Sequence, residues 1–257
     1  MQTQPNSPSK PKPRSQMVRP EITCLPRLTI WRRIFRRFAI ILVRLVVWLF
    51  TRARVYGFEH IPRQGPALVV SNHLGDADLV VGIALSPVQV EALSKAELYD
   101  YPVLGKLMDA YGVIWVHRGQ PDRHALRAAL DGLRQERFIA IAPEGRESLT
   151  GALEQGTEGA AYLALKAGVA VLPLTFTGTE NARIYGNLKR LRRTDVTMTV
   201  GAPFRLEEQP DRKRAIELGT QKIMHALAAQ LPPEYQGVYA STGECDDEGL
   251  VRGARER

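Results

Sequence analysis

Cysteine is scarce in this chain of 257 residues, and its scarcity excludes two kinds of site. Only Cys24 and Cys245 occur, and we expect both in peripheral segments. Two such residues cannot build a disulfide framework or a cluster of thiolate ligands around a metal ion. The composition therefore fits a protein of a reducing compartment.

Long apolar runs are also missing. The most apolar segment, residues 28–50, reads LTIWRRIFRRFAIILVRLVVWLF, and arginines interrupt it. A spanning helix needs about 20 consecutive, predominantly apolar residues, so we expect no transmembrane helix. Residues 1–16, MQTQPNSPSKPKPRSQ, lack the apolar core of a signal peptide. We expect residues 1–26 to form a disordered basic tail and residues 240–257 a second disordered tail.

Positive charge is in excess, with a formal net charge of +8 at pH 7. This excess indicates an anionic partner, which could be nucleic acid, a membrane surface or a phosphorylated substrate. Residues 27–52 favour the membrane, because Arg33, Arg37 and Arg44 fall on one side of a helix and apolar residues on another. The apolar stripe consists of Trp31, Ile34, Phe38, Ile41, Leu45 and Trp48.

We therefore expect residues 27–52 to be an amphipathic, membrane-associating helix. A helix that packs on the protein core and leaves its arginines in solvent has the same periodicity, so this alternative stays open. We do not expect nucleic-acid binding, because the aromatic residues lie within the apolar stripe and are not interleaved with the basic ones.

Past Gly57, short β-rich runs alternate with helical stretches. Strands are predicted at 66–71, 112–117, 138–142 and 169–176, and a half-exposed edge strand at 194–200. Helices are predicted at about 158–167, where Gly168 forms the C-terminal cap, and at about 211–231. The alternation predicts a single α/β domain over 53–239, with a mainly parallel or mixed sheet covered by helices.

Polar residues follow three of these strands. His73 comes after the first, Arg118 after the second, and the segment 143–146 after the third. In open α/β sheets the ligand crevice lies outside the carboxyl ends of the strands, so we expect these groups to converge there.

His73 and Asp78 are suited to general-base chemistry. If a turn at Gly75 leads into a helix that starts near Asp76, the Asp78 carboxylate can accept the Nδ1 hydrogen of His73. Nε2 is then free to act as a base. The sequence contains no G-x-S-x-G elbow, and Ser71 lies too close to His73 in the chain to point at Nε2. The substrate would therefore supply the hydroxyl that loses its proton.

Two alternatives accompany this interpretation. The His-x4-Asp spacing recurs at His117 and Asp122, where Pro121 and Arg118 lead us to expect a coincidence. A metal site is also conceivable, although no H-E-x-x-H or paired-histidine spacing supports it. That site would use His73, Asp76 and Asp78 with His117 or His124.

Four blocks, taken together and in order, resemble the glycerolipid acyltransferase family, which includes the lysophosphatidic acid acyltransferases. The blocks are SNHLGDAD, SKAELYDYPVLGKLMDAYGVIWVHRG, APEGRES and GVAVLPLTFTGTEN. The resemblance covers roughly residues 55–239, and the ordered set is far more specific than any single block.

The resemblance implies that His73 takes the proton from an acceptor hydroxyl and that Asp78 orients it. The hydroxyl then attacks the thioester of acyl-CoA or acyl-carrier protein, the cosubstrates, and no metal or bound cofactor is needed. The remaining residues are implied to bind substrate, with the basic ones near an acceptor phosphate. These residues are Lys95, Gly112, Arg118, Glu144, Gly145 and Arg146.

The third block departs from the family's usual P-E-G-T-R-S. Arg146 stands where threonine is expected, and Glu147 stands where arginine is expected. We expect Arg146 to reach the same phosphate from one position earlier; otherwise the acceptor is not a glycerol phosphate. An exposed ion pair within the loop is the alternative for Glu144 and Arg146.

The expected function is transfer of a fatty acyl group to a hydroxyl of lysophosphatidic acid or a related lysophospholipid or glycerol phosphate. The expected location is peripheral, on the cytoplasmic face of the cell membrane, with the phospholipid surface as partner. The basic run 187–193 is predicted to meet membrane phosphates or an acidic carrier protein, or to be a solvated loop. The rival is a non-catalytic phospholipid-binding protein of the same fold, and a hydrolase is a weaker alternative.

Overall fold

Short β-rich runs form a seven-stranded sheet in the computed structural model, which describes residues 19–118 and 122–240. The strand order is β1-β7-β6-β2-β5-β3-β4. The five strands from β6 to β4 are parallel, whereas β7 is antiparallel to β6 and β1 is parallel to β7. The strands are β1 Thr51–Tyr56, β2 Ala67–Ser71, β3 Val90–Lys95, β4 Ile114–Val116, β5 Phe138–Ile141, β6 Ala170–Thr177 and β7 Thr194–Val200. The prediction of a mainly parallel, mixed sheet is confirmed.

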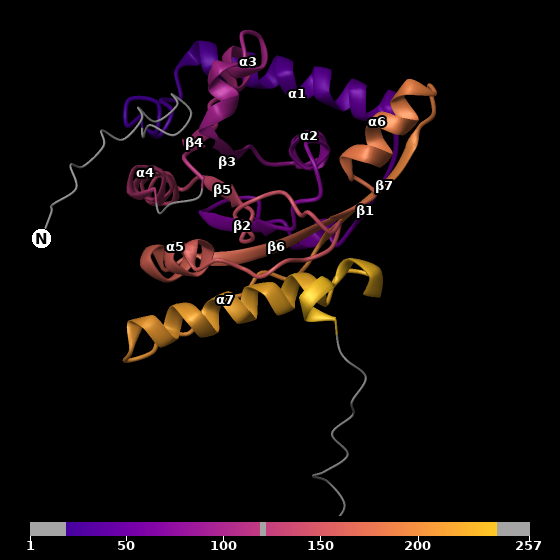
Figure 1. Cartoon of the computed structure of the whole chain (residues 1–257). Helices are drawn as coiled ribbons and strands as arrows, with labels where there is room; N and C mark the ends of the chain where they lie inside the picture. Colours follow the sequence, from indigo (N-terminus) through magenta and orange to yellow (C-terminus); the bar gives the residue numbers. More distant parts are fainter. Residues whose placement is uncertain (1–18, 119–121, 241–257) are drawn as a thin grey trace, which may run out of the picture.

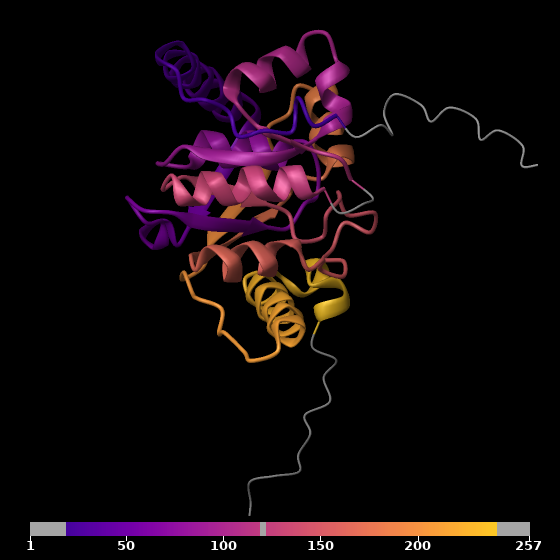
Figure 2. The same ribbon diagram turned by 90° about the vertical axis from the view of Figure 1, so that its left-hand side faces the viewer.

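Helices cover both faces of this sheet, as Figures 1 and 2 show. They are α1 Ile30–Phe50, α2 Ala77–Leu85, α3 Leu104–Tyr111, α4 Arg123–Arg134, α5 Gly159–Ala167, α6 Asn181–Lys189 and α7 Arg212–Ala228. Helices α4, α5 and α7 pack on one face, and α1 and α2 pack on the other. In β2, Leu68 and Val70 join the first core and Ala67 and Val69 the second. Burial on both faces of the sheet explains why β2 is a continuous apolar run.

Two strands were not predicted, and one was placed wrongly. The sequences of β1, TRARVY, and β3, VEALSK, carry charged residues that hide their strand character. We expected residues 194–200 to form an edge strand. However, β1 pairs with β7 along its outer side, so β7 lies inside the sheet.

The N-terminal boundary also differs from the prediction. Residues 1–18 and 241–257 lie outside the described residues, but residues 19–26 pack against the domain. Arg19 forms an ion pair of 2.8 Å with Asp100, and Thr23 and Pro26 are buried. The last eight residues of the expected disordered tail therefore have a defined position, because they find partners that lie far along the chain.

Helix α1 is attached to the domain through its arginines. Arg36 is 1% exposed, forms an ion pair of 3.1 Å with Glu91 of β3, and donates to the carbonyl oxygens of Tyr111 and Gly112. Arg137 meets the same Glu91 oxygen at 3.1 Å. Arg44 donates to the carbonyl oxygens of Ala84 and Ser86 rather than facing away from the protein. The docked side of the helix thus combines these arginines with apolar residues such as Ala39, Val43 and Val47, whereas Arg33 and Arg37 stay exposed.

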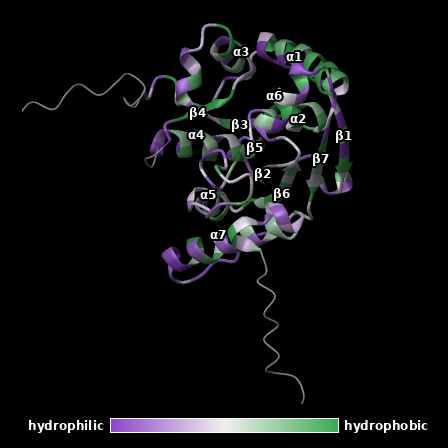
Figure 3. Ribbon diagram, turned by 45° about the vertical axis from the view of Figure 1, so that its right-hand side comes forward, coloured by the Kyte–Doolittle hydropathy of each residue, from purple (hydrophilic) through white to green (hydrophobic). Residues whose placement is uncertain are grey.

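The apolar stripe of α1 faces outward. Its six side chains are between 50% and 79% exposed: Trp31, Ile34, Phe38, Ile41, Leu45 and Trp48. Figure 3 shows α1 as a hydrophobic helix at the periphery of the molecule. No helix among residues 19–118 and 122–240 has both the length and the apolarity needed to cross a bilayer. The helix therefore combines a docked side of mixed character with an exposed apolar face, which neither of our two expectations described in full.

Candidate active site

The carboxyl ends of the parallel strands bring the polar segments to one edge of the sheet. His73 follows β2, the segment 143–148 follows β5, Lys95 ends β3, and Arg118 lies just beyond β4. Neighbouring strands lie about 4.8 Å apart, so the three steps from β2 to β4 separate His73 and Arg118 by roughly 14 Å at the backbone. The β5 loop lies between them.

His73 and Asp78 form a direct contact. Helix α2 begins after Asp76, and Nδ1 of His73 lies 2.9 Å from Oδ2 of Asp78. The backbone N–H groups of Leu74 and Gly75 donate to the same oxygen at 2.7 and 3.0 Å. These bonds hold the turn and favour the tautomer in which Nδ1 carries the hydrogen. The His73 side chain is 21% exposed, and its Nε2 has no hydrogen-bond partner among the described residues.

Asn72 anchors this loop, and the sequence interpretation missed its role. Its amide group accepts a hydrogen bond from the N–H of Phe176 at 2.8 Å and donates to the carbonyl oxygen of the same residue at 2.9 Å. Asn72 is buried, so both of its bonds join the end of β2 to β6 where water cannot compete. A polar amide directly after an apolar strand was the available signal.

Glu144 also supports the loop. Its two carboxylate oxygens accept the backbone N–H groups of His73, at 3.1 Å, and of Glu154, at 2.9 Å. Burial raises the pKa of Glu144 to about 7, although the two N–H donors favour the charged form. The carboxylate is therefore a link between two loops, and both of its oxygens are already engaged.

The next two residues, Gly145 and Arg146, have roles within the loop itself. Gly145 adopts a left-handed conformation, with φ of 73°, that suits a tight turn. Arg146 is exposed, and its Nε and Nη2 atoms donate to Oε2 of Glu154 at 2.9 and 2.6 Å. An ion pair within the loop was the alternative for Glu144 and Arg146; Arg146 does form one, but its partner is Glu154 and not Glu144.

Glu147 occupies the position beside the catalytic loop. The N–H of Ser148 donates to the carbonyl oxygen of His73 at 2.8 Å, which fixes the two loops together. Oε1 of Glu147 accepts a hydrogen bond of 2.7 Å from Asn181, and the oxygen of the Asn181 amide accepts the N–H of Asp76 at 3.0 Å. A single side chain therefore connects Glu147 to the start of α2.

Two basic residues face the same edge. Arg118 is half-buried, and burial lowers its pKa while Glu97 and Glu147 nearby oppose that shift. Lys95 is half-buried at the end of β3, directly opposite Val116 in the pairing of β3 with β4.

Gly112 is not part of this edge. It precedes β4, so it lies at the amino edge of the sheet, where it caps α3 with φ of 94°. A Cβ at this position would lie 2.8 Å from Nη2 of Arg36. We therefore correct its expected role in substrate binding: this glycine allows α1 to approach the domain.

The second His-Asp pair also forms. Nδ1 of His117 lies 2.9 Å from Oδ2 of Asp122, but both side chains are at most 5% exposed. The N–H of Arg19 donates to Nε2 of His117 at 3.1 Å. Asp122 is the N-terminal cap of α4 and accepts the N–H groups of His124 and Ala125. The pair is therefore not a mere coincidence of spacing, and its role is structural.

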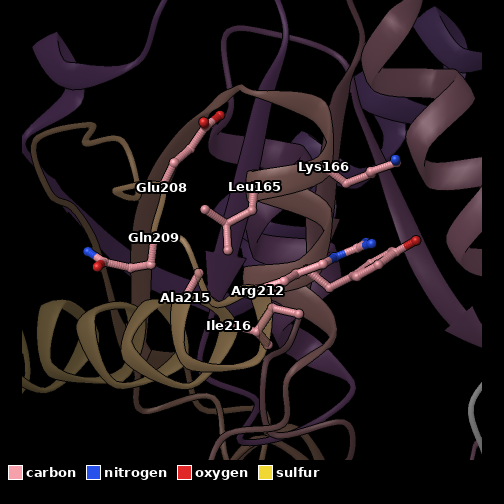
Figure 4. Close-up of a pocket in the computed structure, with 8 residues that line it drawn as sticks. Leu165, Lys166, Glu208, Gln209, Arg212, Ala215 and Ile216 are labelled. Carbon is pink, nitrogen blue, oxygen red and sulfur yellow. The ribbon is translucent and has the colours of Figure 1, made fainter.

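A metal cluster and a hollow elsewhere in the fold were the other places to look for a site. Within the part of the chain that the structure describes, no three His, Cys, Asp or Glu side chains gather as metal ligands. Figure 4 shows a hollow between α5 and α7, where Arg212 stacks on the ring of Tyr162 at 5.3 Å. Leu165 and Lys166 line it at the end of α5 that leads into β6, at the opposite edge of the sheet from His73.

Part of the chain matches a known protein family. Residues 52–177 match the family model described as Acyltransferase. Over these residues, the chain belongs to the acyltransferase family. The matched segment of the acyltransferase contains β1 to β6 and the loops that carry His73, Arg118 and Glu144.

Three relatives illustrate the similarity. A chloroplastic 1-acyl-sn-glycerol-3-phosphate acyltransferase of Arabidopsis thaliana is 28% identical over 178 residues, which cover 68% of this chain and 50% of that protein. A lyso-ornithine lipid O-acyltransferase of Pseudomonas aeruginosa is 34% identical over 137 residues, 53% of this chain and 51% of that protein. The chain spans about half the length of these curated relatives.

The third is a solved structure. The 1-acyl-sn-glycerophosphate (LPA) acyltransferase PlsC of Thermotoga maritima superimposes with a TM-score of 0.57. The alignment covers 79% of this chain and 84% of that one at 21% identity, and it therefore supports the fold.

Proposed function

We propose that this acyltransferase moves a fatty acyl group from a thioester donor to a hydroxyl of lysophosphatidic acid or a related lysophospholipid. The observation that carries the proposal is the contact between His73 and Asp78 at the carboxyl edge of the sheet, with Nε2 of His73 free of partners among the described residues. The names of the curated relatives, which are acyltransferases of lysolipids, support the same chemistry.

In the proposed reaction, Nε2 of His73 removes the proton of the acceptor hydroxyl as its oxygen attacks the thioester carbonyl. Asp78 holds Nδ1–H and stabilises the imidazolium that forms. The C–S bond of the tetrahedral intermediate then breaks, and His73 returns the proton to the departing thiolate. The donor is acyl-CoA or acyl-carrier protein. This sequence of steps balances without a metal or a bound cofactor.

We further propose that the exposed stripe of α1 binds the phospholipid surface that contains the acceptor. Helix α3, which contacts α1, also exposes the apolar side chains of Leu104 and Leu107. Arg33 and Arg37 are exposed beside it and can meet anionic headgroups. Removing one large apolar side chain from water is worth about 1.5–3 kcal/mol, so several together suffice for reversible binding. A cytoplasmic membrane face fits the low cysteine content.

The decisive experiment measures transfer of a labelled acyl chain from acyl-CoA and from acyl-carrier protein to a panel of lysolipids, with wild type and His73→Ala. Loss of a positioned base lowers kcat by about 10²–10⁴. Equal activity of the variant would remove His73 from the mechanism. Lipid binding without transfer to any lysolipid would favour a non-catalytic binding protein, and release of free fatty acid without acceptor would indicate a hydrolase.

A further inference from the structure

The charge around Arg118 does not suit a phosphate monoester. Glu97 and Glu147 lie near Arg118, and their carboxylates oppose the lowering of its pKa by burial. Neither carboxylate forms an ion pair within 4.0 Å among the described residues, and Oε2 of Glu97 is buried without a hydrogen-bond partner. Lys95 faces the same edge from the end of β3, so two cations meet two acids and the group has no net positive charge to offset a dianion.

Arg146 does not restore the balance. Both of its side-chain bonds go to Glu154, so this carboxylate already neutralises its charge. The position that follows it holds Glu147, so the loop between β5 and α5 places a negative charge beside the His73 turn. Asp76, at the start of α2, adds a further carboxylate, which accepts a hydrogen bond from Tyr185 at 3.0 Å.

Glu147 is held in place rather than free to turn away. Asn181 donates to Oε1 and simultaneously accepts from the backbone of Asp76, and Ser148 is tied to the carbonyl oxygen of His73. Among the described residues, the other oxygen of Glu147 has no hydrogen-bond partner. A half-buried carboxylate that is fixed and makes no direct ion pair among the described residues is suited to bind a cation from a ligand.

We propose that Glu147 makes this site select lysophospholipids whose headgroup carries an ammonium group beside its phosphodiester. The proposal rests on the proposed acyl transfer and specifies its acceptor. The phosphodiester, with one negative charge, faces Arg118, and the ammonium group faces Glu147. A phosphate monoester carries close to two negative charges at neutral pH and would meet the acidic side of the site with repulsion.

The test compares kcat/KM for lysophosphatidylethanolamine with that for lysophosphatidic acid and for lysophosphatidylglycerol, which lacks the ammonium group. We expect wild type to favour the ethanolamine lipid by about tenfold or more. Glu147→Gln retains the bond to Asn181 and should lower this ratio by about tenfold. Glu147→Arg should reverse the preference. Glu158→Gln removes one exposed charge at the start of α5 and should leave the ratio unchanged.

A general folding defect lowers activity on all acceptors and leaves their ratio intact, so the ratio isolates selectivity. Should Glu147→Gln fail to fold, Asn181→Ala releases the carboxylate without changing its charge and should also lower the ratio. Wild type that uses lysophosphatidic acid equally well, or a ratio that the Glu147 variants leave unchanged, would overturn the inference. Absence of transfer to every acceptor would instead refute the proposed function.

Discussion

Nδ1 of His117 lies 2.9 Å from Oδ2 of Asp122, which is the separation between His73 and Asp78 as well. The two pairs differ in what surrounds the second ring nitrogen. Nε2 of His117 accepts the N–H of Arg19 inside the protein, whereas the His73 side chain is 21% exposed at the sheet edge. The same local geometry therefore serves helix capping in one place and is available to a substrate in the other.

We expect His117→Ala to lower stability and to leave catalysis nearly intact. The substitution leaves the N–H of Arg19 without its acceptor and removes one of the two hydrogen bonds to Oδ2 of Asp122, at a cost of about 1–3 kcal/mol. Urea unfolding and acyl-transfer assays on the same preparation measure both quantities. A fall in kcat as large as that expected for His73→Ala would show that the two pairs are not functionally distinct.

Glu144 gives the stability of the protein a dependence on pH. Its pKa is raised from 4.5 to about 7 by burial, so the folded state prefers the protonated form. The stabilisation is present in full below pH 4.5 and is lost as pH rises through about 7, which amounts to roughly 3 kcal/mol. In Glu144→Gln, the difference in unfolding free energy between pH 5 and pH 8 should shrink. An unchanged difference would assign the pH dependence to other groups.

The exposed stripe of α1 leads to a prediction about membrane binding. Replacing Trp31, Phe38 and Trp48 by serine should lower partitioning onto anionic vesicles at least tenfold, since each loses about 1.5–3 kcal/mol of possible burial. The three side chains are 64–79% exposed, so the fold should be unaffected. Val238→Ser, at a site that is 70% exposed elsewhere, is the matched control. Partitioning of the triple variant equal to that of wild type would refute this role of α1.

Point substitutions test the stripe more cleanly than removal of the helix. Deleting the residues before Thr51 also removes Arg36, which leaves Glu91 buried with Arg137 as its remaining ion-pair partner. Loss of binding by such a truncation would then mix a surface effect with a defect in the core.

The buried ion pair makes a separate prediction about stability. Arg36→Met should lower the free energy of unfolding, but by less than the about 3–5 kcal/mol that an uncompensated buried charge costs, because Arg137 still pairs with Glu91. The double variant with Glu91→Leu should recover part of the loss. Urea unfolding measures the first effect, and limited proteolysis within α1 should report its detachment. A single variant as stable as wild type would contradict the docking role of Arg36.

Features that depend on neighbours in the chain could be predicted from the sequence. The strands β2, β5 and β6 are apolar runs buried on both faces, and Gly168 ends α5 in the left-handed conformation that its position indicated. The contact of His73 with Asp78 belongs to the same class, because one turn and the first residues of a helix suffice to form it.

Features that depend on distant partners were decided by the tertiary structure. Glu91 is tolerated within a strand because Arg36 and Arg137 reach it from other elements, and β7 is internal because β1 pairs with it. Helical periodicity separated the two sides of α1 but contained no information on which side would dock. Short segments determine local backbone preferences and burial patterns. The pairing of buried charges and the choice of an exposed face depend on the assembled fold.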